Sequence, residues 1–190
     1  MTVNKNKNLR WQKDLPLTYT DCMETVTSNK QFLTFRLAEE QYGLDVLQVR
    51  EVLEVPRITK VPRMPDFLKG VINIRGSVLS VIDLRTKLGL AEIERSIHSR
   101  VIIIEIDFGN EQLSVGILVD SVQEVLDINL ADVAAPPHIG TAIDASFIDG
   151  IAKQDGRFIM LLNIDRVFNA QELHHLNAAG ETREAAAAEA

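Results

Sequence analysis

The chain contains an internal repeat, and this repeat constrains its fold more than any other feature. A shift of 73 positions aligns residues 49–53 with 122–126, and a shift of 80 aligns residues 67–84 with 147–164. The coinciding pairs include Phe35 and Phe108, Gly43 and Gly116, Val46 and Val119, Phe67 and Phe147, Gly70 and Gly150, and Gly76 and Gly156. A repeat of this length predicts two similar structural units of about 70 residues each. Because the two shifts differ, the second copy carries an insertion, which includes Pro136 and Pro137.

Short apolar segments with the alternation of strands make up most of both copies. Residues 31–37 alternate apolar and polar side chains, which is typical of a half-buried strand, whereas the apolar run 101–106 is typical of a strand buried on both faces. Further strands are predicted at 42–46, 70–84 with a break at Gly76, 112–119 and 158–164, and short helices at 84–90 and 165–176. Residues 49–55 fit either a helical turn or a strand.

The size of the units predicts how they are arranged. A unit of about 70 residues is marginally stable alone, so the two copies are expected to pack together and bury apolar faces at their junction. Short strands separated by frequent turn signals favour small barrels over one flat sheet. The predicted fold class is therefore all-β, with two small barrels and a groove between them where a partner could bind.

Composition and charge exclude several classes of protein. The formal charge of −7 argues against nucleic-acid binding, and a single cysteine, Cys22, rules out an internal disulfide and suggests the cytosol. No apolar run is long enough to span a membrane, and the first residues lack the apolar core of a secretory signal. We expect a flexible N-terminal arm at 1–28, a folded body at 29–171, and a C-terminal helix end and tail at 172–190.

The N-terminal arm has one large apolar residue, Trp11. The simpler interpretation is that Trp11 packs somewhere on the body, and the alternative is that it belongs to a docking motif.

Catalytic and metal-binding signatures are missing from the sequence. There is no phosphate-binding loop, dinucleotide fingerprint or nucleophile elbow, and Asp107-Phe108-Gly109 is better explained as a turn than as a kinase magnesium motif. The four histidines, His98, His138, His174 and His175, lack the spacing of metal ligands. We therefore expect a protein without enzymatic activity, metal or cofactor.

Three charged positions lie among apolar neighbours. Glu51 follows Val49, Arg75 precedes Gly76, and Arg85 closes the segment after Asp83. One interpretation is that the arginines pair with local carboxylates and fix loops. The other is that Glu51 and Arg75 border an exposed apolar strip and set the register of a bound partner, since interfaces favour Arg and use charge for specificity.

Taken together, these segments resemble the CheW adaptor family. The resemblance covers about residues 30–170 and rests on several motifs. They are Phe32 to Asp45, Val49-Arg-Glu-Val52, Phe67-Leu-Lys-Gly-Val-Ile-Asn-Ile-Arg-Gly76, Val81-Ile-Asp-Leu-Arg85, Val115 to Asp120 and Phe147-Ile-Asp-Gly150. The sequence departs from the family at Ser80, where many members have proline.

The resemblance implies two intertwined, five-stranded barrels of SH3-like type, a cytoplasmic location and no catalysis. It also implies two partners: the C-terminal regulatory domain of the histidine kinase CheA, and the helical hairpin tip of chemoreceptors, which lies in the groove between the barrels. Neither nucleic-acid binding nor membrane insertion is implied.

Carried over residue by residue, the resemblance predicts two contact sites. The receptor site comprises Val49, Glu51, Val52, Gly70 and Arg75 from the first half, and Val101, Val115 and Val122 from the second. Ile139, in the insertion after Pro136-Pro137-His138, is expected to contact the kinase.

The leading hypothesis is an adaptor between chemoreceptors and CheA. Alternatives are the adaptor of a twitching-motility or other chemosensory pathway, and, from another class, a double-barrel enzyme or small-ligand binder.

Overall fold

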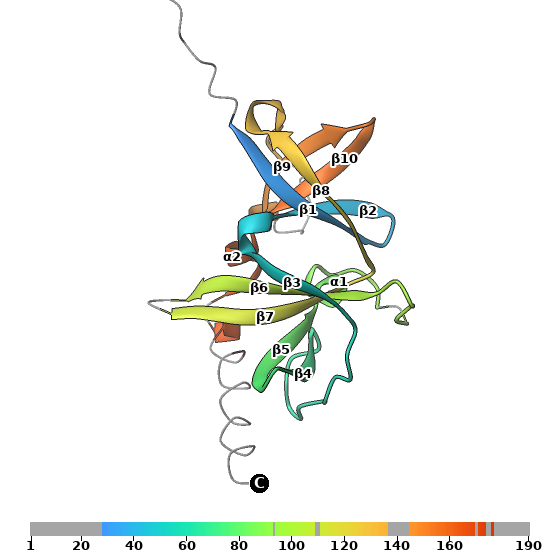
Figure 1. Cartoon of the computed structure of the whole chain (residues 1–190), viewed down its shortest axis with the longest axis vertical. Coiled ribbons are helices and arrows are strands. Elements are labelled where there is room, and N and C mark those ends of the chain that lie inside the picture. The colour runs from blue at the N-terminus through green and yellow to red at the C-terminus, as the bar shows by residue number, and fades with distance from the viewer. Residues whose placement is uncertain are drawn as a thin grey trace, which may run out of the picture.

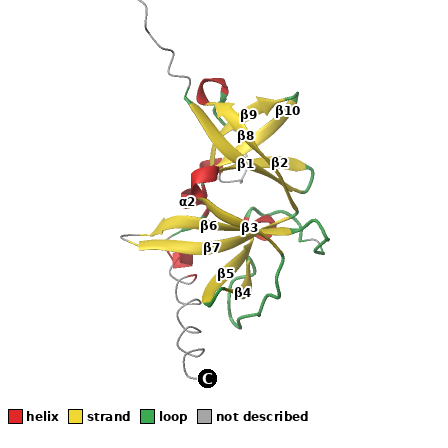
Figure 2. Cartoon of the chain, viewed as in Figure 1, coloured by secondary structure: helices red, strands yellow, loops and turns green. Residues whose placement is uncertain are grey.

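The computed structural model describes residues 28–92, 94–108, 111–136, 145–169, 171–173 and 176. Within these residues the chain forms ten strands and a few short helices (Figures 1 and 2). The first half contains β1 (Asn29–Leu37), β2 (Glu40–Asp45), the 3-10 helix η1 (Val46–Gln48), β3 (Val49–Glu54), β4 (Leu68–Ile74), β5 (Ser77–Asp83) and α1 (Leu84–Lys87). The second half contains β6 (Arg100–Phe108), β7 (Glu111–Val119), β8 (Ser121–Asn129), η2 (Leu130–Asp132), η3 (Ala145–Phe147), β9 (Ile148–Gln154), β10 (Arg157–Leu162) and α2 (Ile164–Val167).

The strands form two five-stranded sheets with the same topology. One sheet has the order β3-β6-β7-β5-β4 and comes from a continuous stretch of chain, so we call it the continuous sheet. The other has the order β8-β1-β2-β10-β9 and comes from the chain on both sides of that stretch, so we call it the split sheet. Figure 1 shows the split sheet above and the continuous sheet below.

Each sheet combines strands from both copies of the repeat. The continuous sheet takes three strands from the first copy and two from the second, and the split sheet does the reverse. This exchange confirms the prediction of an all-β fold with two intertwined, SH3-like units. The sheets are not fully closed barrels. Instead, the chain that follows edge strand β3 or β8 forms a single antiparallel bridge to the opposite edge strand, β4 or β9, at Thr59–Val71 and at Ala134–Ile151.

The strand register corrects one part of the repeat alignment. Thr34 lies opposite Gly43 in the split sheet, and Ile103 lies opposite Gly116 in the continuous sheet. Counting from these pairs, the structural equivalent of Phe35 is Ile104, and not Phe108 as the shift of 73 suggested. The hairpin of β6 and β7 is longer than the equivalent hairpin of β1 and β2. A single shift of 73 therefore aligns β2 with β7 and β3 with β8, but it does not align β1 with β6.

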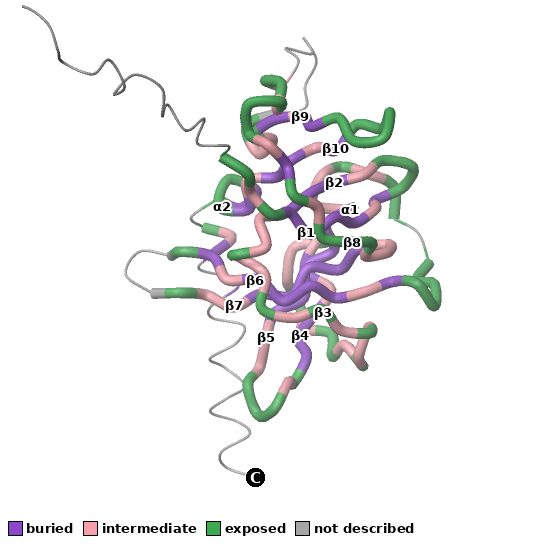
Figure 3. Tube along the Cα trace, turned by 45° about the horizontal axis from the view of Figure 1, so that its top comes forward, coloured by how far each residue is buried: buried purple, intermediate pink, exposed green. Residues whose placement is uncertain are grey.

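Apolar side chains form three clusters that explain the arrangement. The largest lies between the two sheets and includes Phe35 and Leu44 from the split sheet and Ile104 and Ile117 from the continuous sheet. A smaller cluster lies inside each unit, around Phe32, Ile159 and Leu161 and around Val81, Val101 and Ile103. Figure 3 shows buried backbone running through the centre of the molecule. Most strands therefore bury side chains on both faces.

Two hairpins turn through equivalent two-residue loops. Arg75-Gly76 joins β4 to β5, and Asp155-Gly156 joins β9 to β10. All four residues have positive φ, with values of 52° and 95° in the first loop and 50° and 78° in the second. Positive φ at both central residues defines a type I′ turn, which matches the right-handed twist of the strands.

Other local predictions have clear outcomes. Residues 49–54 form a strand, which decides between the two interpretations left open for this segment. The helix predicted at 84–90 is shorter, α1, and is followed by Gly89 at φ 75°. Asp107 and Phe108 end strand β6, whereas Gly109 lies outside the described residues. The described residues also exclude several positions for which the sequence made predictions, namely the arm up to residue 27, His138, Ile139, His174 and His175.

Candidate partner-binding surface

Strand β3 forms an open edge of the continuous sheet. Among the described residues it pairs only with β6, so its other side meets no further strand of that part of the chain. Its residues alternate between half-buried and exposed. Val49 packs against the core between the sheets, whereas Val52 is 39% exposed. This edge is the part of the predicted receptor site that is most accessible to another protein.

Glu51 and Arg75 connect this edge strand to the β4–β5 turn. The Arg75 Nη2 atom lies 3.3 Å from the Glu51 Oε2 atom, and the Arg75 side chain is 84% exposed. An exposed ion pair of this kind contributes at most about 1 kcal/mol to stability. The pair therefore does little to hold the fold, and it leaves an exposed cation next to a carboxylate at the strand position that precedes Val52.

The other predicted arginine has a structural role. Arg85 forms a mostly buried ion pair with Asp120, and its Nε atom donates a hydrogen bond of 2.9 Å to the Ala91 carbonyl. Asp120 also accepts a hydrogen bond of 2.7 Å from the Ala38 amide. For Arg85, the interpretation as a residue that fixes loops is the one the contacts support.

Gly70 is constrained by the fold itself. It is buried in β4 with φ at 136°, and a Cβ atom there would lie 2.1 Å from the Thr59 carbonyl oxygen. Gly150, its repeat equivalent, faces Val133 and Ala134 in the same way. Both glycines permit the bridge that partly closes each unit. An effect of Gly70 on partner binding would therefore act through the position of the bridging segment.

The three residues of the second half that were predicted to contact the receptor differ in how far they are exposed. Val101 and Val115 have no exposed area, because Val101 lies inside the continuous unit and Val115 lies in the core between the sheets. Neither side chain can contact a partner in this conformation. Val122 is half-buried against the same core. The accessible part of the predicted receptor site is thus Val52, Glu51 and Arg75.

The split sheet has an edge strand of equivalent form. Val125 of β8 corresponds to Val52 in the repeat and is 45% exposed. Both edge strands carry a β-bulge at the equivalent place, which bends them away from a flat edge. The Glu51–Arg75 pair has no counterpart, because the position equivalent to Arg75 in the β9–β10 turn is Asp155.

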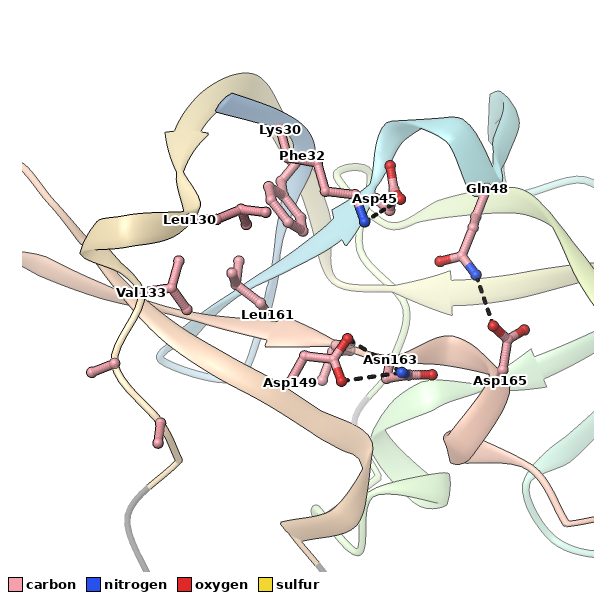
Figure 4. A pocket seen from close by; sticks show the side chains of 13 residues that line it. Lys30, Phe32, Asp45, Gln48, Leu130, Val133, Asp149, Leu161, Asn163 and Asp165 are labelled. Carbon is pink, nitrogen blue, oxygen red and sulfur yellow. Dashed lines mark hydrogen bonds and ion pairs between the residues drawn. The ribbon is translucent and has the colours of Figure 1, made fainter. Parts of the chain in front are cut away.

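A pocket opens beside the crossover from β2 to β3 (Figure 4). Its apolar part includes Phe32, Leu130 and Leu161, and its polar part includes Asp149 and Asp165. Asp165 accepts a hydrogen bond of 3.3 Å from Gln48. Partial burial, followed by the negative charge of Asp107, raises the pKa of the Asp165 carboxyl.

Metal binding and membrane crossing have no support among the described residues. No group of three or more His, Cys, Asp or Glu side chains there could hold a metal ion. Within the same residues, no helix combines the length and apolar character that crossing a membrane would need.

Comparison with known proteins shows which family this architecture belongs to. The profile of the CheW family, described as the CheW-like domain, matches residues 31–172. The chain belongs to the CheW-like domain family. A similar relative is the chemotaxis protein CheW of Klebsiella aerogenes, 31% identical over 147 residues that cover 77% of this chain and 86% of the relative. Protein FrzA of Myxococcus xanthus is 30% identical, and the match covers 73% of this chain and 84% of FrzA.

A solved structure supports the same placement of the CheW-like domain. The crystal structure of the scaffolding protein TtCheW from Thermoanaerobacter tengcongensis is 40% identical, with a TM-score of 0.67. The superposition covers 76% of this chain and 90% of TtCheW.

Sequence reasoning missed the acidic pocket of this CheW-like domain. Its residues come from β1, β2, η1, β9, β10 and α2, which are far apart in the sequence. One signal was available. Asp165 occupies the repeat position of Arg85, so the two halves carry opposite charges at equivalent places.

Proposed function

We propose that this chain is a non-enzymatic scaffold that couples chemoreceptors to the histidine kinase CheA in bacterial chemotaxis. Support comes from its membership of the CheW-like domain family and from its similarity to proteins named as chemotaxis protein CheW and as a scaffolding protein. In this proposal the protein acts in the cytoplasm and is recruited to receptor arrays at the membrane.

The observation that carries the receptor part of the proposal is the group of Val52, Glu51 and Arg75. An exposed valine on an open edge strand offers apolar surface, and the Glu51–Arg75 pair, which begins at the preceding strand position and whose charged atoms lie 3.3 Å apart, offers both a cation and a carboxylate. The tip of a receptor helical hairpin could bury Val52 and exchange hydrogen bonds with the charged pair. Charges at the border of an apolar contact fix the register of the partner and exclude wrong partners.

The kinase part of the proposal involves a different region. We assign Ile139, in the insertion of the second copy, to the contact with CheA, as the resemblance implies. The receptor and the kinase would then occupy separate surfaces, which a coupling protein requires.

A second pathway remains a candidate. The protein could serve a twitching-motility or other chemosensory system with a different receptor, and the similarity to FrzA, a relative with another name, is compatible with that alternative. Purification of the receptors that bind the chain in its own cell would decide between the two pathways.

The test is co-sedimentation of receptor-containing membranes and CheA with and without the protein. We expect the protein to increase both the amount of CheA in the pellet and its autophosphorylation rate. The variant Arg75→Glu should lose receptor binding and keep its fold. Arg157→Glu, with the same change of charge on an exposed residue at the equivalent hairpin, is the matched control.

Two outcomes would contradict the proposal. If CheA sediments and is activated equally without the protein, in a system free of paralogues, the coupling function is excluded. If Arg75→Glu and Arg157→Glu bind receptors equally well, Arg75 does not belong to the receptor site.

A further inference from the structure

The pocket beside the β2–β3 crossover has room for a large side chain and its neighbours. Its volume is about 660 Å³, and its apolar part includes Phe32, Leu130, Val133 and Leu161. Leu130 is 40% exposed, so part of its apolar surface is open to an occupant of the pocket. Figure 4 shows these apolar side chains on one side and Asp149, Asn163 and Asp165 on the other.

The wall of this pocket carries excess negative charge. Three carboxylates line it, those of Asp45, Asp149 and Asp165, against one cation, Lys30. The Lys30 Nζ atom lies 2.7 Å from the Asp45 Oδ2 atom, and the Arg166 Nη1 atom lies 3.6 Å from the Asp149 Oδ1 atom. Among the described residues no cation forms an ion pair with Asp165, whose carboxylate accepts hydrogen bonds from the Gln48 side chain and from the backbone of Asp107. Partial burial, and after it the negative charge of Asp107, raise the pKa of the Asp165 carboxyl.

The chain itself contains a segment of complementary chemistry. The first 13 residues carry four cations, Lys5, Lys7, Arg10 and Lys13, and no Asp or Glu. Leu9 and Trp11 are interspersed among them, and Trp11 is the one tryptophan of the chain. A basic segment with an aromatic side chain at its centre matches a pocket with an apolar floor and an acidic wall.

We propose that the segment 9–13 docks in this pocket of its own chain, with Trp11 on the apolar floor and Arg10 and Lys13 beside Asp149 and Asp165. This inference concerns the N-terminal arm and does not depend on which receptor or kinase the protein binds.

The attachment point of the arm favours this occupant over a separate molecule. The described chain begins at Ser28, whose carbonyl accepts a hydrogen bond of 3.1 Å from the amide of Leu130, a residue of the pocket. The arm therefore leaves the body at the edge of the pocket. Sixteen residues lie between Trp11 and Ser28, and this stretch reaches up to about 60 Å when extended, so the segment can turn back without strain.

The tether also lowers the affinity that docking needs. A short connection gives the attached segment an effective concentration of the order of 1 mM at the pocket, so even a weak contact is occupied most of the time. Closing a loop of this length costs little more than closing a shorter one. A separate peptide would need a much higher affinity to compete at cellular concentrations.

Fluorescence of Trp11 in the full-length protein tests this directly, because Trp11 is the one tryptophan and can be excited at a wavelength that tyrosine does not absorb. We expect emission at shorter wavelength than for tryptophan in water, and protection from acrylamide. The variant Asp149→Asn/Asp165→Asn should lower the ratio of docked to undocked chains by roughly tenfold, since two exposed ion pairs are lost. The matched control is Asp66→Asn/Asp155→Asn, which changes the net charge equally at exposed residues outside the pocket.

A second pair of variants avoids any risk to the fold. Arg10→Glu/Lys13→Glu lies in the arm, outside the described body, and should expose Trp11 as strongly as the pocket variants. Carbodiimide cross-linking should join Lys13 to Asp149 or Asp165 within one chain.

Several results would overturn the proposal. Emission typical of a fully hydrated tryptophan in the unmodified protein would exclude docking. Protection that survives both pairs of variants would place Trp11 elsewhere on the body. Cross-links formed between differently labelled copies, with protection lost on dilution, would mean that a second chain supplies the occupant.

Discussion

The chain passes between its two sheets twice, and the two crossovers are held in different ways. At the passage from β7 to β8, Asp120 contacts the buried Arg85 guanidinium and accepts a hydrogen bond from the Ala38 amide. At the passage from β2 to β3, the corresponding tie is one hydrogen bond of 3.3 Å between Gln48 and Asp165. Arg85 and Asp165 occupy equivalent positions of the repeat. One crossover is fixed by a buried ion pair, whereas the other leaves an acidic pocket.

The polar contacts of the two equivalent hairpins, β4–β5 and β9–β10, also differ. Lys69 and Asp83 lie 3.4 Å apart across β4 and β5, and the equivalent residues are Asp149 and Asn163, whose closest approach is 3.1 Å. Asp83 caps α1, whereas Asn163 forms no capping hydrogen bond to α2. The apolar positions and the glycines are shared by the two copies, but the polar ties are not. The fold thus depends on burial and backbone constraints, and each half has its own polar contacts.

The largest expected effect tests the shared backbone constraint. Gly70→Ala should destabilise the protein by about 4 kcal/mol, because its Cβ would meet the Thr59 backbone at 2.1 Å and its φ is positive. Gly150→Ala should cost about 2 kcal/mol, because the closest atom is the movable Val133 side chain at 2.3 Å. Urea unfolding measures both. Gly76→Ala isolates the cost of positive φ, since no atom lies near its Cβ position. An equal loss for Gly70→Ala and Gly76→Ala would contradict the clash.

The next effect tests the two crossovers directly. Asp120→Ala should cost about 3 kcal/mol, because it leaves the Arg85 guanidinium buried without its partner. Gln48→Ala should cost less than about 1 kcal/mol, since it removes one exposed hydrogen bond. Asp120→Asn keeps an acceptor for the Ala38 amide, so its cost in stability should lie between those of Asp120→Ala and Gln48→Ala. If Asp120→Ala and Gln48→Ala shift the urea midpoint equally, the difference between the crossovers has no energetic meaning.

The success and the failures of sequence reasoning follow from the same difference. The repeat and the apolar alternation predicted the strands, because periodicity along the chain records which faces are buried. The exchange of strands between units came from the family resemblance, since each local segment would look the same without it. The run 101–106 correctly predicted that Val101 is buried, yet the site carried over from the family included both Val101 and Val115, because a site carried over by position says nothing about exposure. The lining of the acidic pocket was not predicted, because its residues are far apart in the sequence and meet only after the split sheet has formed.

A smaller effect concerns the bulges at the two edge strands. Thr34 is buried, donates a hydrogen bond of 2.7 Å to the Glu124 carbonyl, and accepts one of 3.2 Å from the Glu124 amide. Its structural equivalent, Ile103, has no hydroxyl. Thr34→Val should therefore cost about 1.5 kcal/mol and increase amide exchange at Glu124, whereas Thr34→Ser should keep the exchange slow. Unchanged exchange in Thr34→Val would show that the bulge needs no side-chain support in either sheet.

The smallest effect has the opposite sign and tests why Arg75 differs from Asp155. Both residues have φ near 50° in equivalent type I′ turns, a conformation that Asn and Asp tolerate and Arg does not favour. Arg75→Asn should therefore stabilise the protein by about 0.5 kcal/mol, even though the exposed pair with Glu51 is lost, and Asp155→Asn should change nothing measurable. Glu51→Gln, measured in parallel, gives the contribution of that pair.

An arginine that costs stability in a turn needs another reason to be there, and contact with a partner is that reason in the proposed function. Arg75→Asn should accordingly bind receptor-containing membranes less tightly while its urea midpoint rises, and Asp155→Asn should match the unmodified protein in both measurements. A rise in stability with unaltered receptor binding would remove the functional explanation of the strain. A fall in stability would show that the Glu51–Arg75 pair holds the turn, and that the two hairpins differ in structure and not in binding.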